Sequence, residues 1–480
     1  MTTAILTPGD VEVTTSRDET QGDRRRLLLV AYNFPPVGGA GVQRPVKWAK
    51  YLGQFGWDVT VLTTLNPSVP ARDESLLADL PADVNIVRAK TLEPDYSVKR
   101  NLITAGSENP PGLWQQCKGA MRRVAKRMIK LALQPDPQVL WNPDAIRVGS
   151  QLLREQHHDA ILVTAPAYSS FYIGSALKRR FGVPLVLDYR DEWDLSGKYL
   201  ENAQRDWLSR QVQSRMQRSL LRRADAVVAT TQRSIDALSE KLRELRHSVP
   251  SHCIYNGFDA EDFANPLPDE LSTTGGCDVM QPEKGVFRLV YTGTLWNLTD
   301  IAPLVQAIEH LDMDHPDLVD RLELVCVGRK TPEQLALLGR VEKTSARLVS
   351  IDYCEHATAL QWLRSASGLC LLLSDVPGAE RVVPAKLFEY LAIQKDMLAI
   401  CPGGETADIV GRFYPEGRCS PKQVSQISDW LRKRLTQPTH HRRRPDQSEL
   451  NTFSRKSQTE QLAELLNSVV GASTTRRPRL

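Results

Sequence analysis

The sequence predicts an α/β protein that contains two doubly wound parallel sheets. Two series of short apolar segments, each followed by a segment with helical periodicity, run through the 480-residue chain. The first series begins at Leu27–Ala31 and the second at Phe287–Tyr291, and turn residues such as Asn256–Gly257 and Gly275–Gly276 lie between them. Strands that alternate with helices form parallel sheets, and a chain of this length has room for two such cores.

The overall composition is that of a soluble enzyme. The chain is 41% hydrophobic and 25% charged, with a formal net charge of +4. This basic bias is too weak to indicate nucleic-acid binding, but it suits a phosphate-bearing substrate or an anionic membrane surface. The eight cysteines form no C-x-x-C pair and show no zinc-ligand spacing, so we expect reduced thiols and no metal site. No signal peptide or spanning helix is expected, which favours a cytoplasmic protein.

Each expected element is bounded by turn residues or by a change of periodicity. The expected strands of the first series are Leu27–Ala31, Asp58–Thr63, Ala160–Thr164, Leu185–Asp188 and Ala226–Thr230, and the helices are Val42–Leu52, Tyr168–Phe181 and Trp207–Arg223. The expected strands of the second series are Phe287–Tyr291, Leu322–Val327, Leu348–Ile351, Leu369–Leu373 and Met397–Ile400, and the helices are Ile301–His310, His356–Ser365 and Ala385–Ile393. A final amphipathic helix is expected at Phe453–Val470.

One candidate binding segment is Pro384–Tyr390, which reads P-A-K-L-F-E-Y. Proline favours the first position of a helix, and the free N–H groups there, together with Lys386, suit a diphosphate. Glu389 lies three residues further along, on the same face, where its carboxylate can accept hydrogen bonds from both hydroxyls of a ribose. The simpler alternative is a surface Lys–Glu pair near a helix start.

Glycines and basic residues at other strand ends are further candidates. Gly38–Gly41 lets the backbone approach a phosphate or a sugar, although a tight turn is the simpler alternative. Its spacing is not G-x-G-x-x-G, and Thr63 and Thr64 stand where a nicotinamide site needs an acid. In the second series, Gly293-Thr294 follows one strand and Arg329 another, where a phosphate can be neutralised. A solvated basic turn is the alternative for Arg329.

The segment Asp188–Trp193, D-Y-R-D-E-W, ends a strand of the first series. Doubly wound sheets bind ligands at this end of their strands, so Asp191 or Arg190 is a candidate catalytic residue. There a carboxylate can hydrogen-bond a sugar or accept the proton of an attacking hydroxyl. An internal Asp–Arg pair that braces the loop is the alternative.

The segment Trp114–Leu131 combines an apolar helical stripe with basic residues on the other faces and contains no acid. A basic amphipathic helix of this kind favours contact with an anionic membrane surface. An ordinary surface helix packed on the first domain is the alternative. If this protein meets a membrane, we expect it to lie on the surface.

Six short segments, in this order, resemble GT-B glycosyltransferases, especially glycosyltransferase family 4 and its relatives in bacterial polysaccharide assembly. They cover most of Leu27–Val470. The segments are Phe34–Arg44 (F-P-P-V-G-G-A-G-V-Q-R), Asp188–Trp193, Ala224–Thr231 (A-D-A-V-V-A-T-T), Tyr255–Asp259 (Y-N-G-F-D), Val290–Leu295 (V-Y-T-G-T-L) and Pro384–Ala392 (P-A-K-L-F-E-Y-L-A).

The resemblance implies a GT-B fold, in which two Rossmann-like domains face each other across a cleft and a C-terminal helix crosses back to the first domain. The first domain would bind the acceptor and the second the nucleotide sugar. Glu389 matches the ribose-binding glutamate that ends the family's E-x7-E motif, and Gly38 and Gly39 match the glycine loop that faces the donor phosphates. Enzymes of this kind are usually retaining and need no metal.

Three positions depart from the family pattern. Arg381 stands where the first glutamate of the motif belongs, and Glu380 is one residue away. The loop Thr294–Asn297 carries none of the family's basic residues, so Lys386 and Arg329 are expected to supply that charge. In addition, Asp396 replaces a proline before the next strand.

The expected activity is transfer of a sugar from a nucleotide-diphosphate sugar to a hydroxyl acceptor, lipid-linked or a polysaccharide precursor, at the inner membrane face. No cofactor beyond the donor substrate is expected. The alternatives are a catalytically inactive nucleotide-sugar-binding protein and a GT-B epimerase or phosphorylase. The expected organisation is a disordered leader (1–24), an acceptor domain (25–260), a linker (261–284), a nucleotide-sugar domain (285–450), a crossover helix (451–470) and a disordered tail (471–480).

Overall fold

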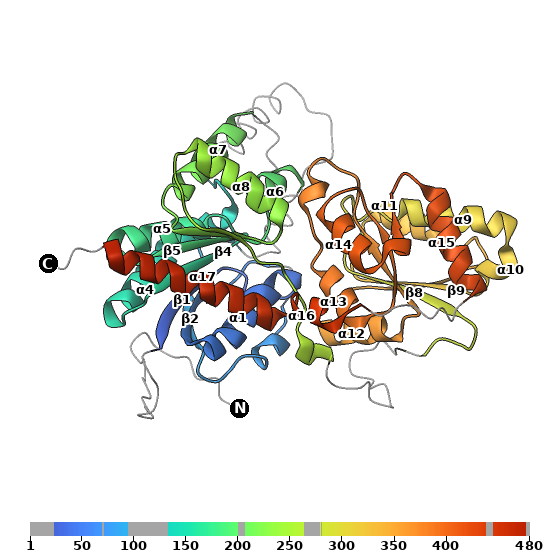
Figure 1. The fold of residues 1–480 in the computed structure, drawn as a ribbon, viewed down its shortest axis with the longest axis horizontal. Coiled ribbons are helices and arrows are strands. Elements are labelled where there is room, and N and C mark those ends of the chain that lie inside the picture. Colours follow the sequence, from blue (N-terminus) through green and yellow to red (C-terminus); the bar gives the residue numbers. More distant parts are fainter. Residues whose placement is uncertain are drawn as a thin grey trace, which may run out of the picture.

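The structure, a computed structural model, contains two α/β units that lie side by side (Figure 1). Residues 1–23 of the expected leader, the basic segment Trp114–Leu131 and most of the expected linker lie outside the described residues. The described residues are 24–69, 72–94, 133–199, 207–263, 279, 281–437 and 445–476.

The first unit contains a seven-stranded parallel sheet with the order β3-β2-β1-β4-β5-β6-β7. The chain moves outward from β1 to one edge and then returns to build the other half from β4, as in a doubly wound sheet. Its strands are β1 (Arg25–Ala31), β2 (Trp57–Thr64), β3 (Asn85–Ala89), β4 (Ala160–Ala165), β5 (Leu185–Tyr189), β6 (Ala226–Ala229) and β7 (Ser251–Cys253). Its helices include α1 (Gln43–Tyr51), α4 (Asn142–Glu155), α5 (Ser170–Phe181), α6 (Trp193–Tyr199), α7 (Trp207–Leu221) and α8 (Gln232–Glu244).

The second unit repeats this plan with a six-stranded parallel sheet of order β10-β9-β8-β11-β12-β13. Its strands are β8 (Phe287–Thr292), β9 (Leu322–Val327), β10 (Arg347–Ile351), β11 (Gly368–Leu372), β12 (Asp396–Ile400) and β13 (Arg418–Cys419). Its helices include α9 (Ala302–Asp314), α10 (Pro316–Val319), α11 (Pro332–Val341), α12 (His356–Ser365), α13 (Lys386–Ile393), α14 (Glu405–Phe413), α15 (Val424–Thr436) and α16 (Gln447–Asn451). The predicted α/β fold with two doubly wound sheets is therefore confirmed.

The continuous apolar runs of the sequence form the central strands because both faces of each sheet are covered by helices. Along β1, Leu28 and Val30 pack into one buried cluster, whereas Leu27 and Leu29 pack into another on the opposite face. This alternation follows from the two-residue period of a strand. It explains why the apolar runs show no polar alternation.

The last helix, α17 (Arg455–Arg476), crosses back from the second unit and packs on the first, as the red helix in Figure 1 shows. Its residues Leu462, Leu466 and Val469 join the cluster that contains Leu27 and Leu29. This confirms the expected crossover helix. The helix continues to Arg476 and so includes part of the segment predicted as a tail. Within the described part of the chain, none of the helices has the length and apolar character needed to cross a membrane.

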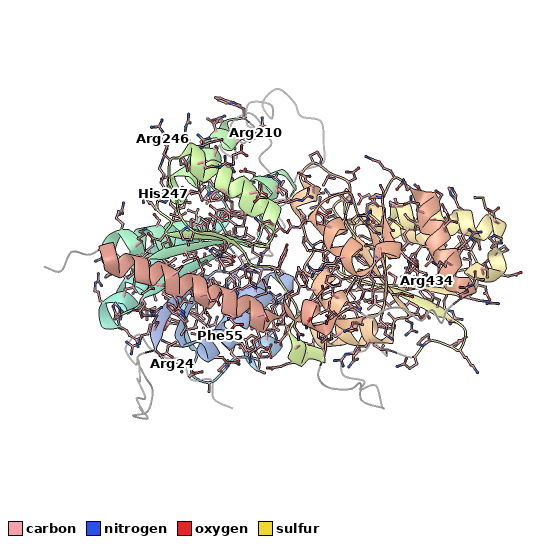
Figure 2. All side chains as sticks on the ribbon, viewed as in Figure 1. Arg24, Phe55, Arg210, Arg246, His247 and Arg434 are labelled. Carbon is pink, nitrogen blue, oxygen red and sulfur yellow. The ribbon has the colours of Figure 1, made fainter. Side chains whose placement is uncertain are left out.

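The departure at Asp396 has a packing explanation in the second unit. Asp396 begins β12, and its Oδ2 accepts a hydrogen bond from Nε of Arg434 on α15 at 3.0 Å. Arg434, labelled in Figure 2, is buried. An acid at this position therefore neutralises a buried guanidinium, which a proline could not do.

Candidate functional site

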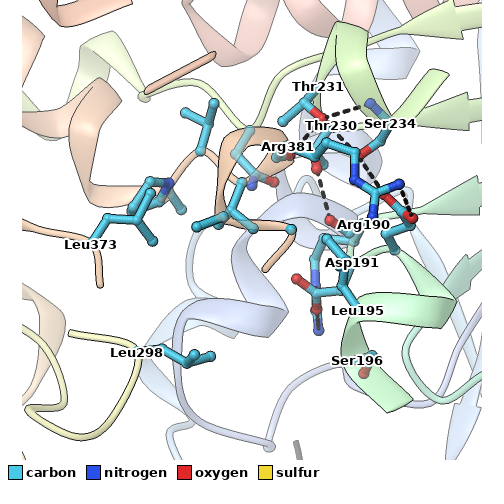
Figure 3. A pocket seen from close by; sticks show the side chains of 18 of the residues that line it. Arg190, Asp191, Leu195, Ser196, Thr230, Thr231, Ser234, Leu298, Leu373 and Arg381 are labelled. Carbon is cyan, nitrogen blue, oxygen red and sulfur yellow. Dashed lines mark hydrogen bonds and ion pairs between the residues drawn. The ribbon is translucent and has the colours of Figure 1, made fainter. Parts of the chain in front are cut away.

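A cavity of about 350 Å³ lies between the two units. On the first unit it is lined by residues that follow β5 and β6, including Arg190, Asp191 and Thr230. On the second unit the lining runs from Leu373, directly after β11, to Ala385 at the start of α13 (Figure 3). Both walls therefore come from the carboxyl ends of parallel strands, which is where doubly wound folds bind ligands.

The two candidate catalytic residues both line this cavity. The Arg190 guanidinium donates a hydrogen bond to the Gly41 carbonyl and lies 3.3 Å from Oδ2 of Asp191. The backbone is held as well, because Thr230 Oγ1 donates to the Arg190 carbonyl at 2.7 Å and the Tyr168 hydroxyl donates to the Asp191 carbonyl at 2.9 Å. The Asp191 side chain remains 46% exposed. Its carboxylate is thus positioned on a fixed loop and accessible to a ligand.

The first aspartate of the same motif, Asp188, does not line the cavity but forms a buried ion pair with Arg44 of α1. The guanidinium binds both carboxylate oxygens, at 2.9 and 3.2 Å, and the side chains are 1% and 0% exposed. Arg44 also donates to the carbonyls of Ile254 and Tyr255 at 2.9 Å. Asp188 is therefore braced by an arginine of α1, whereas Arg190 pairs with Asp191 of the same segment at 3.3 Å. The Arg44–Asp188 pair joins β5, α1 and the segment after β7.

Lys386, Gly293 and Thr294 lie together at the end of β8. The Lys386 ammonium donates to the Tyr291 hydroxyl at 2.9 Å and lies 4.0 Å from the centroid of that ring. The Tyr291 hydroxyl donates in turn to the Thr294 carbonyl at 2.9 Å. Gly293 has a φ of +117°, which favours glycine, and a Cβ there would lie only 2.6 Å from Lys386 Nζ and would displace that ammonium.

The environment of Lys386 favours an anionic ligand. Burial lowers the pKa of Lys386 to about 7, although the Glu389 charge acts in the opposite direction. Among the described residues, no carboxylate forms an ion pair with this ammonium. A cation that is partly desolvated and lacks a counter-ion gains strongly from a phosphate at this position.

Glu389 pairs with a histidine rather than with Lys386. Its Oε1 lies 3.0 Å from Nε2 of His356, the first residue of α12, and both side chains are half-buried. Burial alone would lower the pKa of His356, but the hydrogen bond and charge of Glu389 and the charge of Asp262 raise it overall. The sequence did not point to His356, whose only signal was its place at a helix start.

Gly38 and Arg329 lie on opposite units near the same tyrosine. The exposed Arg329 guanidinium lies 5.4 Å from the centroid of the Tyr353 ring. The Tyr353 hydroxyl is 3.4 Å from the position of a Cβ on Gly38. Gly39 has a φ of +100° with no atom within 4 Å of such a Cβ, so its backbone is open to close approach.

Arg381, which replaces the expected glutamate, connects the two units. Its Nη1 lies 2.9 Å from Oε1 of Glu192, whose side chain is 3% exposed, and its carbonyl accepts a hydrogen bond from Thr231 Oγ1 at 2.9 Å. Burial raises the pKa of Glu192, and Arg381 partly offsets that effect. The guanidinium is therefore committed to the first unit (Figure 3).

A second connection caps a helix across the interface. Glu405 of α14 accepts hydrogen bonds from the backbone N–H groups of Gln232 and Arg233, at 2.7 and 2.9 Å, at the start of α8. It also accepts from the Tyr255 hydroxyl at 2.7 Å. A carboxylate is favourable at a helix N-terminus because it satisfies free N–H groups and interacts with the helix dipole.

Reversing the charge of Arg381 is expected to destabilise the protein rather than restore a family motif. Arg381→Glu would place a second carboxylate against the buried Glu192, and we expect the free energy of unfolding to fall by about 3 kcal/mol. Urea unfolding followed by tryptophan fluorescence measures this change. The double variant Arg381→Glu, Glu192→Arg should recover part of the loss. A gain in sugar transfer by the single variant would contradict this role.

Three acids near α1 come close enough together to be considered as metal ligands. Oxygens of Asp79, Asp259 and Asp262 lie within 4.8 Å of one another. Lys47 Nζ is 2.6 Å, and Lys50 Nζ 3.1 Å, from Oδ2 of Asp259. Burial tends to raise the pKa of Asp259, but Lys47 and other partners lower it to about 2. The lysines thus neutralise this cluster, which we interpret as an ion-pair network.

The comparisons with known proteins agree with this architecture. Residues 38–252 match the family described as the glycosyl transferase 4-like domain. The first unit therefore resembles a glycosyl transferase 4-like domain. Its match begins at the candidate glycine loop and ends within β7, so it contains Gly38, Gly39, Arg190 and Asp191. No curated protein sequence matches the chain.

Solved structures show that the whole chain has the GT-B fold. Anabaena HepE, solved with UDP and glucose, covers 92% of this chain and 100% of its own, with 14% identity and a TM-score of 0.56. The UDP-forming alpha,alpha-trehalose-phosphate synthase of Burkholderia vietnamiensis covers 93% and 100%, with 13% identity and a TM-score of 0.59. The lipopolysaccharide outer core galactosyltransferase WaaB covers 92% and 99%, with 10% identity and a TM-score of 0.51.

Proposed function

We propose that this protein transfers a sugar from a nucleotide-diphosphate sugar to a hydroxyl acceptor. The observation that carries the proposal is the position of Lys386, a partly desolvated cation beside the Gly293–Thr294 turn and at the start of α13. A diphosphate at this point would meet the ammonium and the positive end of the α13 dipole, although the N–H groups of Leu387 and Phe388 already donate to the carbonyls of Pro384 and Ala385. The solved complex of Anabaena HepE with UDP and glucose supports this assignment by fold.

In this proposal the donor spans the interface between the two units. Lys386 and Arg329 neutralise the diphosphate, and the backbone at Gly38 and Gly39 approaches it from the first unit. Glu389 accepts hydrogen bonds from the ribose hydroxyls, and His356 holds its carboxylate in place through the 3.0 Å contact. The charge of the leaving diphosphate is thereby stabilised by groups that are already oriented.

The transfer step uses the cavity beside this donor site. The bond between the anomeric carbon and the diphosphate oxygen breaks, and a bond from that carbon to the acceptor oxygen forms. Asp191, exposed on the cavity wall, is positioned to hydrogen-bond the acceptor hydroxyl or to accept its proton, and Arg190 holds the loop. Resemblance to family 4 favours retention of configuration and a lipid-linked or polysaccharide acceptor.

A second candidate function is a catalytically inactive nucleotide-sugar-binding protein. It is favoured by one observation, the commitment of Arg381 to Glu192 where the family has a glutamate that contacts the sugar. Such a protein would bind the donor reversibly but would not cleave it to free nucleotide and sugar. Turnover therefore separates the two candidates, whereas binding alone does not.

Calorimetry with UDP, GDP and their sugars, followed by a nucleotide-release assay with polyprenyl-phosphate-linked and free saccharide acceptors, tests the proposal. We expect micromolar binding of one nucleotide class and acceptor-dependent release of that nucleotide. Binding without release across the acceptor panel would favour the inactive protein. Failure of every nucleotide and nucleotide sugar to bind would contradict both functions.

Donor affinity is expected to fall as the pH rises above about 7. Only protonated Lys386 attracts the diphosphate, and the pKa of this group is about 7 in the free protein, so binding above that pH requires proton uptake. The dissociation constant of a nucleotide sugar should rise by up to about tenfold per pH unit above this point. Calorimetry from about pH 6 to about pH 9 measures the effect.

The Lys386→Arg variant is the matched control, because arginine stays charged over this range. Its donor affinity should vary much less with pH than that of the unchanged protein. Equal pH dependence in both proteins would show that another group causes the effect.

We also propose that the protein binds anionic membranes through Trp114–Leu131, a segment outside the described residues. The support is its basic amphipathic pattern alone. Flotation with vesicles that contain phosphatidylglycerol should carry the protein upward at low salt. Absence of co-flotation under those conditions would contradict this proposal.

A further inference from the structure

The cavity between the two units has two chemically different walls. Arg190 and Asp191 from the first unit and Arg381 from the second contribute charge on one side, whereas most of the aliphatic side chains that line the cavity come from the second unit (Figure 3). In Figure 3, Leu298 and Leu373 lie on the side away from the polar group around Arg190 and Arg381. The aliphatic residues that line the cavity include Leu195, Leu298, Leu373, Val376, Val382 and Val383.

Most hydroxyl and charged groups around the cavity already have partners within the protein. Thr230 and Thr231 donate to the carbonyls of Arg190 and Arg381, and Thr299 donates to the Thr294 carbonyl at 2.6 Å. Glu192 is held by Arg381 at 2.9 Å. These groups are therefore poorly available to a ligand. The exposed Asp191 carboxylate remains accessible, and it belongs to the first unit.

The position of the cavity connects it to the proposed donor site. Its lining includes Pro384 and Ala385, which directly precede Lys386 on α13. A group attached to a diphosphate at that helix start would therefore extend into the cavity. A volume of about 350 Å³ lies near the lower end of the roughly 300–1,000 Å³ typical of small-molecule pockets, which is room for one substituted monosaccharide.

We propose that the cavity binds the sugar of the donor and that this sugar carries a methyl-bearing substituent, as a 6-deoxy or an acetamido sugar does. The proposal rests on the proposed glycosyltransferase function. A methyl group against Leu298, Leu373 and Val376 gains from burial. A hydroxyl in the same place loses its hydrogen bonds to water and gains none from these side chains.

The expected preference for a methyl-bearing donor sugar over a hydroxylated one follows from the apolar character of the cavity wall. Apolar pockets favour a fitting methyl group over its absence, or over an added hydroxyl, by about 10- to 100-fold. A fully hydroxylated hexose is therefore expected to bind and react, but poorly. Arg381 contributes to this selectivity, since it turns toward Glu192 and leaves no carboxylate at that position to accept sugar hydroxyls.

Matched donor pairs test the inference with the intact protein. UDP-glucose is compared with UDP-6-deoxyglucose and with UDP-N-acetylglucosamine, and GDP-mannose with GDP-rhamnose, by calorimetry and nucleotide release. We expect one methyl-bearing donor to exceed its hydroxylated counterpart by about 10- to 100-fold in affinity or in kcat/KM. A preference for the 6-deoxy or for the acetamido donor identifies which substituent the cavity accepts.

Two variants connect the preference to the wall. Val376→Thr and Leu298→Asn add polar groups at nearly unchanged size, and each should reduce the preference by about tenfold while leaving UDP or GDP affinity unchanged. Leu335→Asn, at a half-exposed position on α11, is the control and should leave the preference as it was.

Two outcomes would overturn this inference alone. One is nucleotide binding with an equal or better response to the fully hydroxylated donors. The other is a change in acceptor KM, without any change in donor preference, in Val376→Thr and Leu298→Asn. Failure of UDP, GDP and all their sugars to bind would instead overturn the proposed function, and this inference with it.

Discussion

The Glu389→Gln variant is expected to lose about 10- to 100-fold in affinity for the nucleotide sugar and at least as much in kcat/KM. A carboxylate accepts hydrogen bonds from two ribose hydroxyls at once, whereas an amide offers one oxygen and no charge. Losing one charge-assisted hydrogen bond costs about 1.5–3 kcal/mol, which corresponds to this range. The substitution keeps the size of the side chain, so α13 and its packing should be unchanged. Calorimetry with the cognate donor and its free nucleotide measures the loss.

The neighbouring acid Glu380 provides the matched control. It is exposed, and its carboxylate accepts a hydrogen bond from the Gly378 N–H at 3.0 Å. Glu380→Gln should change donor affinity less than threefold, or about 0.6 kcal/mol. A larger loss in Glu380→Gln than in Glu389→Gln would mean that Glu380, and not Glu389, makes the main contact with the donor.

His356 provides a second comparison, because its contact with Glu389 has two consequences. His356→Ala leaves the carboxylate in place but removes the group that holds it, so we expect a smaller loss of affinity than in Glu389→Gln. In the Glu389→Gln variant, the pKa of His356 should fall, since the charge that raises it is gone. Nuclear magnetic resonance titration of the histidine measures that shift. An unchanged pKa would contradict the pairing.

The fold was predictable because its signals are local. The central strands are short apolar runs, and the predicted helices repeat their apolar residues at three- and four-residue steps. The short or partly exposed strands β3, β7 and β13 lack such runs, and they were not predicted; nor were the helices α4, α8, α11, α14 and α15. The expected helix Ala385–Ile393 begins one residue before α13, and the expected strand Met397–Ile400 begins one residue after the start of β12. The end of α17 was harder to predict, because the periodic apolar pattern stops before the helix does.

The proximity of candidate site residues can be predicted from the sequence only where these residues follow the ends of neighbouring strands. Gly293 and Lys386 come from different segments, yet both follow adjacent strands of one sheet, so their proximity follows from the fold. The contacts of Arg381 and Glu405 depend instead on how the two units meet. No local pattern records that geometry, and Glu405 reaches residues more than 170 positions away. The sequence therefore indicates which residues each unit contributes to the interface better than it indicates the contacts between the two units.

Replacing Arg44 with methionine is expected to lower the free energy of unfolding by about 3–5 kcal/mol, the largest stability loss that we predict. The variant would leave Asp188, which is fully buried, with only the Thr164 hydroxyl at 2.7 Å as a side-chain donor. Removing one partner of a buried ion pair is this costly because the remaining charge stays desolvated. It would also leave the carbonyls of Ile254 and Tyr255 without their shared donor.

Urea unfolding of Arg44→Met measures this loss of stability. Two further variants test whether the loss comes from the unpaired charge of Asp188. The double variant Arg44→Met, Asp188→Leu should be more stable than Arg44→Met alone, because it removes the unpaired charge as well. Arg218→Met breaks the exposed pair with Glu244, at 2.5 Å and about half-exposed on both sides, and should cost less than about 1 kcal/mol. A loss in Arg44→Met no larger than in Arg218→Met would mean that the pair holds neither β5 nor the loop that carries Asp191. In that case the position of Asp191 on the cavity wall would have to depend on Tyr168 and Thr230 alone.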